Sequence, residues 1–366
     1  MARLLFLTGT PADVEGGSGT FVGISVLRRA LQDLGHDVAL LAPTPRAGHV
    51  SLPERLVFDW RAASRTRRDS AGLDAIVAFD MDGVFLARLS RLSSTPWIAA
   101  IKGTAAEEAR YERGLPALRL RAEAFFEGMH VRGAAGVVAP SEHAAERIAA
   151  EYALPRRRIA VVPEPIDLAR WTRALGEASG PPDGPYPSIL CVAHLYPRKD
   201  IATLLDALAR LPDARLRVVG SGPERGRLES RAHALGLGGR AVFLGHLPFA
   251  RLAEEYRRAS IFCLPSRQEA FGIVFLEAMA AGLPIVAARA AAVPELVAHE
   301  VSGRLVPPGD AAALASALAG LLSDPAAGRR FGEAGRRRVE SFDAPLVAAR
   351  FLDAIGLGAA GGGSPP

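Results

Sequence analysis

Short apolar runs alternate with longer amphipathic segments along this chain of 366 residues. Runs of four or five apolar residues predict strands, and segments with apolar residues at a spacing of three or four predict helices. In the first half, the predicted strands are 3–7, 37–41, 75–79, 97–101, 136–139 and 159–162. The predicted helices between them are 21–34, 84–92, 106–131 and 142–152.

The same alternation starts again after residues 174–187, which are rich in Gly and Pro and have no apolar period. Such a segment is typical of a linker between domains. The predicted strands of the second half are 189–193, 216–220, 241–244, 261–264, 284–287 and 304–306. The predicted helices are 201–210, 224–235, 252–258, 273–281, 311–322 and 326–341.

Regular alternation of strand and helix in both halves predicts an α/β protein with two doubly wound parallel sheets. Ligands of such sheets bind beyond the carboxyl ends of the strands, so two sheets facing across a cleft would suit a reaction between two substrates. The predicted parts are an N-terminal domain, a linker, a second domain, a C-terminal helix and a disordered tail: 1–173, 174–187, 188–344, 345–355 and 356–366.

Composition narrows the class of protein. The formal charge is +5, but aromatic residues are few and no stripe of basic and aromatic residues is present, which argues against nucleic acid as a partner. Cys191 and Cys263 both lie in strand-like runs and are typical of core residues rather than of a disulfide. Apolar runs are too short to span a bilayer, and the chain begins on a strand-like run without a signal-peptide pattern, so we expect a cytoplasmic protein.

Only two of the 44 basic residues are lysines, Lys102 and Lys199. Lysine offers a compact point charge where arginine offers a planar fork. A lysine retained in such an arginine-rich chain is therefore a candidate for a role that needs an ammonium group, although chance retention is the alternative for each.

The segment from Glu269 to Glu277 carries the strongest chemical signal. It follows a predicted strand and starts the helix 273–281, which is apolar at every position except Glu277. A helix that is apolar all round is buried, and a buried carboxylate needs hydrogen-bond donors such as ribose hydroxyls. Glu269 lies in the loop over the helix N-terminus, which favours phosphate. The alternative is that Glu277 pairs with a buried arginine and Glu269 is solvated.

This segment, with Phe271 and Gly272 between two glutamates, resembles the family 4 retaining glycosyltransferases of the GT-B fold. The resemblance implies two Rossmann-like domains facing across a cleft. It also implies transfer of a sugar from a nucleoside-diphosphate-sugar to an acceptor hydroxyl with retention of configuration. In this family the first glutamate meets the donor sugar and the second meets the ribose, which assigns these roles to Glu269 and Glu277. Phe271, Gly272 and Ile273 then belong to the donor site.

The loop after the first strand of the second half resembles the family's phosphate-binding loop. Lys199 matches the lysine that binds the donor diphosphate, and His194 stands where arginine is commoner, so Arg198 would supply the second cation. Fixed cations stabilise the charge that develops on a leaving diphosphate. Lys199, Arg198 and Glu269 are accordingly the predicted catalytic residues.

Four glycines and one histidine complete the predicted donor side. Gly16 and Gly17 lie in a Gly-rich turn after the first strand, where backbone N–H groups can approach a phosphate, although such turns are common. Gly220, Gly222 and His246 follow strands of the second half and resemble loops that line the base pocket. A solvated loop histidine is an equal alternative for His246.

Lys102 ends a predicted strand near the place where many family members carry a histidine on the acceptor side. Asp80, Asp82, Glu107 and Glu108 lie on neighbouring loops and are further acceptor-side candidates. The alternative for the carboxylates is a favourable position at the start of a helix. The segment containing Glu164 and Pro165, where the family more often has Asn-Gly, is interpreted as structural.

No metal ion or cofactor is expected, because the helix N-terminus, Lys199 and Arg198 would neutralise the diphosphate, and no Asp-x-Asp pair follows a strand of the second half. Asp80 and Asp82 have that spacing but lie in the first half. The acceptor, whether glycan, lipid or small molecule, is left open, as are the donor sugar and its base. Two alternative functions stay open for this chain: a nucleotide-sugar epimerase or hydrolase with the same two-domain shape, and a binding protein without catalytic activity. The Gly spacing disfavours a dinucleotide oxidoreductase.

Arg61, Arg65, Arg67 and Arg68 form a basic run in a segment that we interpret as a loop. A solvated face is the first interpretation of such a run. The minority alternative is a peripheral contact with anionic lipid at the inner face of a membrane.

Overall fold

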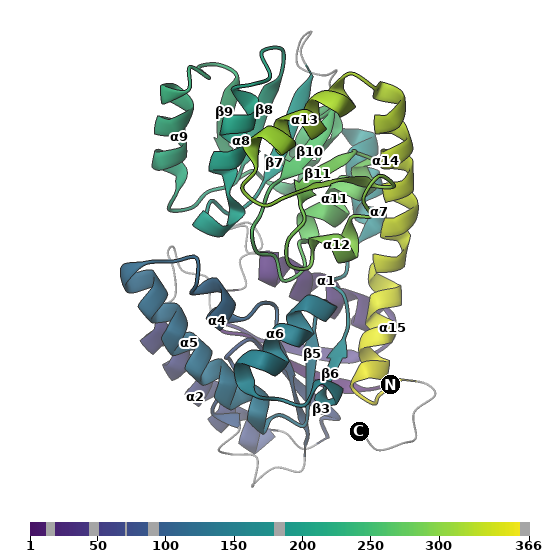
Figure 1. Cartoon of the computed structure of the whole chain (residues 1–366). Coiled ribbons are helices and arrows are strands. Elements are labelled where there is room, and N and C mark those ends of the chain that lie inside the picture. The colour runs from purple at the N-terminus through teal and green to yellow at the C-terminus, as the bar shows by residue number, and fades with distance from the viewer. Residues whose placement is uncertain (12–18, 44–50, 70–71, 87–94, 179–186, 359–366) are drawn as a thin grey trace. The chain divides into compact units, whose positions relative to one another are not determined.

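The computed structural model describes residues 1–11, 19–43, 51–69, 72–86, 95–178 and 187–358. The chain forms two compact units, each with its own parallel sheet (Figure 1). Within the described residues, the first unit runs to Pro165 and resumes at Ala344, and the second runs from Ile166 to Asp343.

The first unit contains a six-stranded sheet in the order β2-β1-β3-β4-β5-β6. All neighbouring strands are parallel, as the alternating pattern predicts. The order reverses between β1 and β3, which makes this the switch point where an open sheet binds ligands. The strands are β1 (Arg3–Leu7), β2 (Asp37–Leu41), β3 (Ala75–Phe79), β4 (Trp97–Ala100), β5 (Gly136–Ala139) and β6 (Ile159–Val161).

Helices cover both faces of this sheet, and the last helix of the chain joins them. Buried residues of that C-terminal helix share one hydrophobic core with strands β1 and β3, and the ring of Phe351 lies 6.2 Å from that of Phe6. The helices are α1 (Gly19–Asp33), α2 (Leu52–Asp69), α4 (Ala105–Glu108), α5 (Gly114–Gly133), α6 (Glu142–Tyr152), the short η2 (Arg156–Arg158) and α15 (Ala344–Ala354).

Two predictions for the first half are wrong. The helix expected at 106–131 is divided into α4 and α5, and Gly114 with φ 61° starts the second of them. The arginine run lies in helix α2 rather than in a loop. The buried face of α2 has helical spacing, but small and polar residues form it, so the apolar pattern was not visible; its members are Asp59, Ala62, Ala63 and Thr66.

The second unit contains another six-stranded parallel sheet, in the order β12-β11-β10-β7-β8-β9. Its order reverses between β7 and β10, which are hydrogen-bonded neighbours. This is the strand order of a Rossmann fold, in which the ligand crevice lies beyond the carboxyl ends of the two strands at the reversal. The strands are β7 (Ser188–Val192), β8 (Arg215–Val219), β9 (Ala241–Gly245), β10 (Ile261–Leu264), β11 (Ile285–Ala288) and β12 (Gly303–Val306).

The helices of the second unit begin with one that the sequence did not predict. Helix α7 extends into the segment expected to be linker, and its Trp171 is buried against the rings of Phe249 and Tyr256. The helices are α7 (Leu168–Glu177), η3 (Pro197–Lys199), α8 (Ile201–Leu208), α9 (Arg225–Ala234), α10 (Phe249–Arg258), α11 (Ile273–Ala281), α12 (Val293–Leu296), α13 (Ala311–Leu322), α14 (Pro325–Val339) and η4 (Glu340–Phe342).

Among the described residues, no single helix is both long and apolar enough to cross a membrane. One pair, Ala311–Leu322 with Pro325–Phe342, reaches the required length and composition only together and is bent by 99°.

Candidate functional site

The switch point of the second unit brings together two motifs that are far apart in the sequence. Lys199 follows β7 and Glu269 follows β10, and Lys199 Nζ lies 2.6 Å from Glu269 Oε1. The hydroxyl of Ser266 donates to the same carboxylate oxygen at 2.8 Å. The two charged side chains are only 14% and 8% exposed. The arrangement fixes an ammonium group beyond the carboxyl ends of β7 and β10, where ligands of such sheets bind.

Helix α11 begins beside this pair. Gly272 precedes it with φ 101°, a conformation that strains other residues, and a Cβ there would lie 2.7 Å from the Phe275 ring. The ring of Phe271 is buried 5.9 Å from that of Phe342. Because the first N–H groups of a helix lack intrahelical partners, the start of α11 offers donors to an anion held by Lys199.

Gly220 and Gly222 have a packing role that the sequence did not reveal. A Cβ at Gly220 would lie 1.9 Å from the carbonyl oxygen of Ala193, and one at Gly222 would lie 2.6 Å from the nitrogen of Leu195. The Leu195 N–H also donates to the Ser221 carbonyl at 2.9 Å. These glycines therefore allow the loop after β8 to pack directly on the loop that carries Lys199.

Two more of the predicted donor residues, His194 and Arg198, lie on the loop that carries Lys199. The guanidinium of Arg198 lies 4.8 Å from the centre of the Tyr196 ring. The centre of the exposed His194 ring lies 6.1 Å from the centre of the same tyrosine ring. Asp200, with φ 50°, accepts a hydrogen bond from Arg267 Nε at 2.7 Å. His246 is exposed after β9, and Gly16 and Gly17 lie outside the described residues.

Glu277 is buried in α11 and is bonded to a tyrosine. The Tyr256 hydroxyl donates to Glu277 Oε2 at 2.7 Å, whereas the sequence suggested a buried arginine as the alternative partner to a ribose. Burial raises the pKa of Glu277 to about 7, and the Tyr256 hydrogen bond opposes this rise. Sequence reasoning missed Tyr256, since one aromatic residue in an amphipathic helix is ordinarily a core residue.

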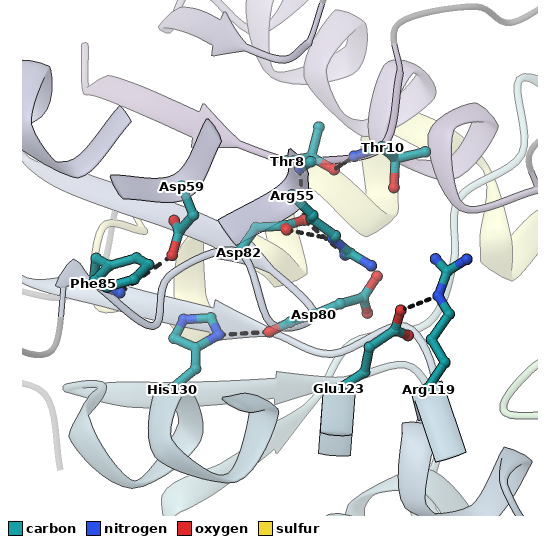
Figure 2. A network of polar contacts seen from close by, with 11 residues as sticks. Thr8, Thr10, Arg55, Asp59, Asp80, Asp82, Phe85, Arg119, Glu123 and His130 are labelled. Carbon is teal, nitrogen blue, oxygen red and sulfur yellow. Dashed lines mark hydrogen bonds and ion pairs between the residues drawn. The ribbon is translucent and has the colours of Figure 1, made fainter. Parts of the chain in front are cut away.

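The switch point of the first unit holds a second polar network (Figure 2). Asp82 follows β3, and its two carboxylate oxygens accept from Arg55 Nε at 2.6 Å and Arg55 Nη2 at 2.9 Å. The Gly9 N–H, which follows β1, also donates to Asp82 at 2.6 Å. Asp82 has no exposed surface, so this acceptor-side candidate is bonded inside the unit. Arg55 could not be recognised from the sequence, because its helix was not predicted.

Asp80 is held in a left-handed conformation with φ 53° beside this pair. Its Oδ1 accepts from the Lys102 N–H at 2.9 Å, and its carbonyl oxygen accepts from His130 Nδ1 at 2.5 Å. Burial raises the pKa of Asp80 to about 6, against the opposing effect of Arg55. A non-glycine residue held at positive φ at a strand end is a feature of functional sites.

His130 comes from α5 and lies beneath the turn that contains Asp80. It is fully buried, which lowers the pKa of its imidazole to about 4, so the ring is neutral and donates through Nδ1. A Cβ at Gly83 would lie 2.3 Å from His130 Nε2. The turn therefore needs glycine at position 83 in order to accommodate the histidine that holds Asp80.

Lys102 is part of an ion pair rather than an isolated strand-end lysine. Its Nζ donates to Oε1 and Oε2 of Glu164 at 2.7 and 2.9 Å, and it lies 5.3 Å from the centre of the Phe79 ring. The pair borders a cavity of about 20 Å³ that Pro140 and Phe351 also line. Such a cavity has room for one water molecule.

The last two acceptor-side candidates lie on α4. Glu107 is 9% exposed and lies 3.0 Å from His143 Nε2 of α6. Glu108 is half-buried on the same helix. Within the described ranges, no group of three or more His, Cys, Asp or Glu side chains is placed to hold a metal ion.

Solved structures that share this fold include a sucrose-phosphate synthase and bacterial glycosyltransferases. The chain superimposes on sucrose-phosphate synthase from Thermosynechococcus elongatus with a TM-score of 0.79 at 24% identity, covering 96% of this chain and 98% of that one. Anabaena Alr3699/HepE in complex with UDP and glucose gives a TM-score of 0.75 at 20% identity, covering 97% and 99%. These likenesses confirm the predicted GT-B fold with two Rossmann-like domains.

Family models and sequence relatives assign the chain further. Residues 177–338 match the model described as glycosyl transferases group 1, and residues 17–170 match glycosyltransferase family 4. A phosphatidyl-myo-inositol mannosyltransferase of Mycolicibacterium smegmatis is 30% identical over 93% of this chain and 90% of its own length. This chain belongs to the family 4 glycosyltransferases, which confirms the resemblance found in the sequence.

A second relative from the same organism matches over a shorter region. It is a GDP-mannose-dependent alpha-(1-6)-phosphatidylinositol monomannoside mannosyltransferase, 36% identical over 185 residues. That match covers 48% of this chain and only 47% of the relative.

Proposed function

We propose that this glycosyltransferase moves a sugar from a nucleoside-diphosphate-sugar to an acceptor hydroxyl with retention of configuration. The observation that carries the proposal is the contact of Lys199 with Glu269 at the switch point of the second unit, beside the start of α11. An ammonium group and helix N–H donors at one point suit a diphosphate. The names of two comparison proteins fit this class of donor: one relative is GDP-mannose-dependent, and one solved structure holds UDP and glucose.

Each donor-side residue has a role that follows from its place. Glu277 accepts hydrogen bonds from the ribose hydroxyls, and Glu269 meets the donor sugar while orienting the ammonium of Lys199. Lys199 and Arg198 stabilise the negative charge that grows on the leaving diphosphate. With these cations and the start of α11, the reaction needs no metal ion and no cofactor.

Asp80 is the acceptor-side residue that the first unit supports best. It is half-buried at the switch point, whereas Asp82 is bonded to Arg55 and has no exposed surface. An ionised Asp80 would accept a hydrogen bond from an acceptor hydroxyl and orient it. Lys102, held by its ion pair with Glu164, would lie beside Asp80 on the acceptor side. The transferase names of the relatives do not favour the epimerase or hydrolase alternative.

A peripheral contact with anionic lipid at the inner face of a membrane is supported by two helices of the first unit. On α2, Trp60 is 57% exposed beside the exposed Arg61. On α5, Leu118 and Phe125 are each 62% exposed, and Arg119 and Arg121 are exposed with them. Exposed apolar residues flanked by arginines suit the boundary between lipid headgroups and acyl chains.

A ligand screen tests the proposed function. We expect a nucleoside diphosphate or its sugar to raise the melting temperature, because a ligand that binds only the native state stabilises it. UDP, GDP, UDP-glucose and GDP-mannose are suitable probes, with and without a chelator. Transfer with the best donor, followed by NMR of the product's anomeric centre, then reports retention or inversion. Hydrolysis of the donor at the same rate with and without an acceptor would contradict a transferase.

A further inference from the structure

Tyr256 and Glu277 form a hydrogen bond in the interior of the second unit. The tyrosine has no exposed surface, and its hydroxyl lies 2.7 Å from Glu277 Oε2 and 3.3 Å from the Val274 carbonyl oxygen. Glu277 keeps 9% of its surface exposed. The hydroxyl therefore approaches the carboxylate from the protein side.

Aromatic packing holds the tyrosine ring rigidly. The ring lies 5.3 Å from that of Trp171 in an edge-to-face arrangement and 5.9 Å from that of Phe262 in a stacked one. These contacts come from α7 and β10, on two sides of the ring. A buried ring with such neighbours has one orientation, so its hydroxyl is a fixed donor rather than an adaptable one.

We propose that Tyr256 is a positioning residue for nucleotide binding, which holds one carboxylate oxygen of Glu277 so that the other meets the ribose hydroxyls. The inference rests on the proposed function, because it assumes that Glu277 binds the ribose. A carboxylate on a long, flexible side chain would otherwise lose rotamer freedom when the ligand binds. The hydrogen bond from Tyr256 already restricts the glutamate before the ligand binds, so less rotamer freedom is lost on binding.

The hydrogen bond also favours the ionised carboxylate. Ribose hydroxyls donate to a carboxylate, so the nucleotide prefers the ionised form of Glu277. Burial raises the pKa of this group to about 7, and the Tyr256 bond lowers it. Without the tyrosine hydroxyl, more of the glutamate would be protonated at neutral pH and nucleotide affinity would fall.

Other polar and titratable groups near the pair have roles of their own. Burial raises the pKa of the Cys191 thiol of β7 to about 12, so this group is neutral near pH 7. Arg336 of α14 donates to the Ala281 carbonyl at the end of α11. Arg170 of α7 lies over the Phe249 ring at 3.8 Å. The pH dependence of nucleotide binding should therefore follow the ionisation of Glu277, whose pKa the Tyr256 hydrogen bond lowers.

The test is the affinity of a nucleotide-sugar as a function of pH. UDP-glucose and GDP-mannose are the probes, because their diphosphate is esterified on both sides and does not titrate near neutrality. Wild-type affinity should rise with pH through about 7. In Tyr256→Phe, the midpoint should move up by about one pH unit, which corresponds to the loss of one hydrogen bond to a charged group. A merely structural role would lower affinity equally at every pH.

Two further variants keep the result interpretable. Site-specific 3-fluorotyrosine at position 256 preserves the packing and donates more strongly, so the midpoint should move down; this measurement decides the matter if Tyr256→Phe does not fold. Tyr152→Phe is the matched control, because it removes the hydroxyl of a buried tyrosine in the other unit and should leave the midpoint unchanged.

The outcomes separate this inference from the proposed function. Wild-type affinity in a folded Glu277→Gln variant would refute the ribose contact itself. A large loss of affinity in Glu277→Gln, combined with an unmoved midpoint in both Tyr256 variants, would overturn the positioning role alone.

Discussion

Lys102 Nζ donates to both carboxylate oxygens of Glu164, at 2.7 and 2.9 Å, and thereby joins the end of β4 to the segment after β6. Their side chains are 14% and 7% exposed. By the resemblance to the family, Lys102 lies at or close to a position where many members carry a histidine near the acceptor, and Glu164 stands where they more often have asparagine. The two departures from the family pattern are therefore partners in one ion pair.

Breaking this pair should destabilise the first unit. Lys102→Ala leaves a carboxylate buried without its counter-ion, and we expect unfolding to become easier by about 3 kcal/mol. The double variant Lys102→Met with Glu164→Gln should recover more than half of that loss, since neither partner is then charged. Urea titration measures both. As a control, Arg231→Ala breaks an exposed pair with Asp206 and should cost less than about 1 kcal/mol. Equal stability of all four proteins would contradict a paired Lys102.

Lys199→Ala should lower turnover far more than donor affinity. One well-placed contact with transition-state charge is worth about 3–4 kcal/mol, or a hundredfold or more in rate. Lys199→Arg should not restore the rate fully, because a guanidinium fork does not replace a point charge bonded to Glu269. Steady-state kinetics and calorimetry with the donor give the two quantities. Turnover within about threefold of wild type in the alanine variant would refute the assigned role.

Glu277 should lower the stability of the folded protein at neutral pH, although it contributes to nucleotide binding. Its pKa is raised from 4.5 to about 7 in the folded protein, so the folded state binds more protons than the unfolded state between these values. Wild-type stability therefore falls as pH rises from about 4.5 to 7, relative to Glu277→Gln, and the difference stays constant above 7. Denaturation of both proteins at pH 5 and pH 8 measures this. A difference that is the same at both values would show that Glu277 does not titrate as a buried acid.

Transfer should depend on the ionised form of Asp80. Its pKa is raised to about 6, so activity at saturating donor should fall as pH decreases through 6, and Asp80→Asn should remove that acidic limb together with most of the activity. Asparagine tolerates the left-handed conformation at this position, so the fold should be retained. Donor affinity should stay near the wild-type value. An unchanged pH profile in the variant would place the acceptor contact elsewhere.

Lipid binding should require the exposed apolar residues of the first unit. The double variant Trp60→Ser with Phe125→Ser should sediment less with vesicles that contain phosphatidylglycerol, and wild-type binding should weaken with salt. Val301→Ser, which changes a residue of the second unit that is 57% exposed, is the control and should bind as wild type does. Equal binding to neutral phosphatidylcholine vesicles would argue against recognition of anionic lipid.

The sequence by itself determined the class of fold and the family. All twelve strands of the described residues were predicted to within about a residue at each end, because each contains a short apolar run, and central strands such as β3, β7 and β10 are buried on both faces. Helix α11 was predicted from Ile273 to Ala281, because it is apolar except at Glu277 and Gly282 ends it. The motif from Glu269 to Glu277 identified the family, since its residue types and spacing are local properties of the chain.

The tertiary structure alone decided which charged residues are partners. Lys199 and Glu269 are 70 residues apart, and Lys102 and Glu164 are 62 apart, so no local pattern could pair them. Helix α2 was missed because a buried face that contains Asp59 and Thr66 has no apolar period, and with it Arg55 was missed as the partner of Asp82. The periodicity of apolar residues indicates which positions are buried. The free-energy cost of burying a charge is offset by hydrogen-bond and ion-pair partners, and only the folded chain brings these partners within reach.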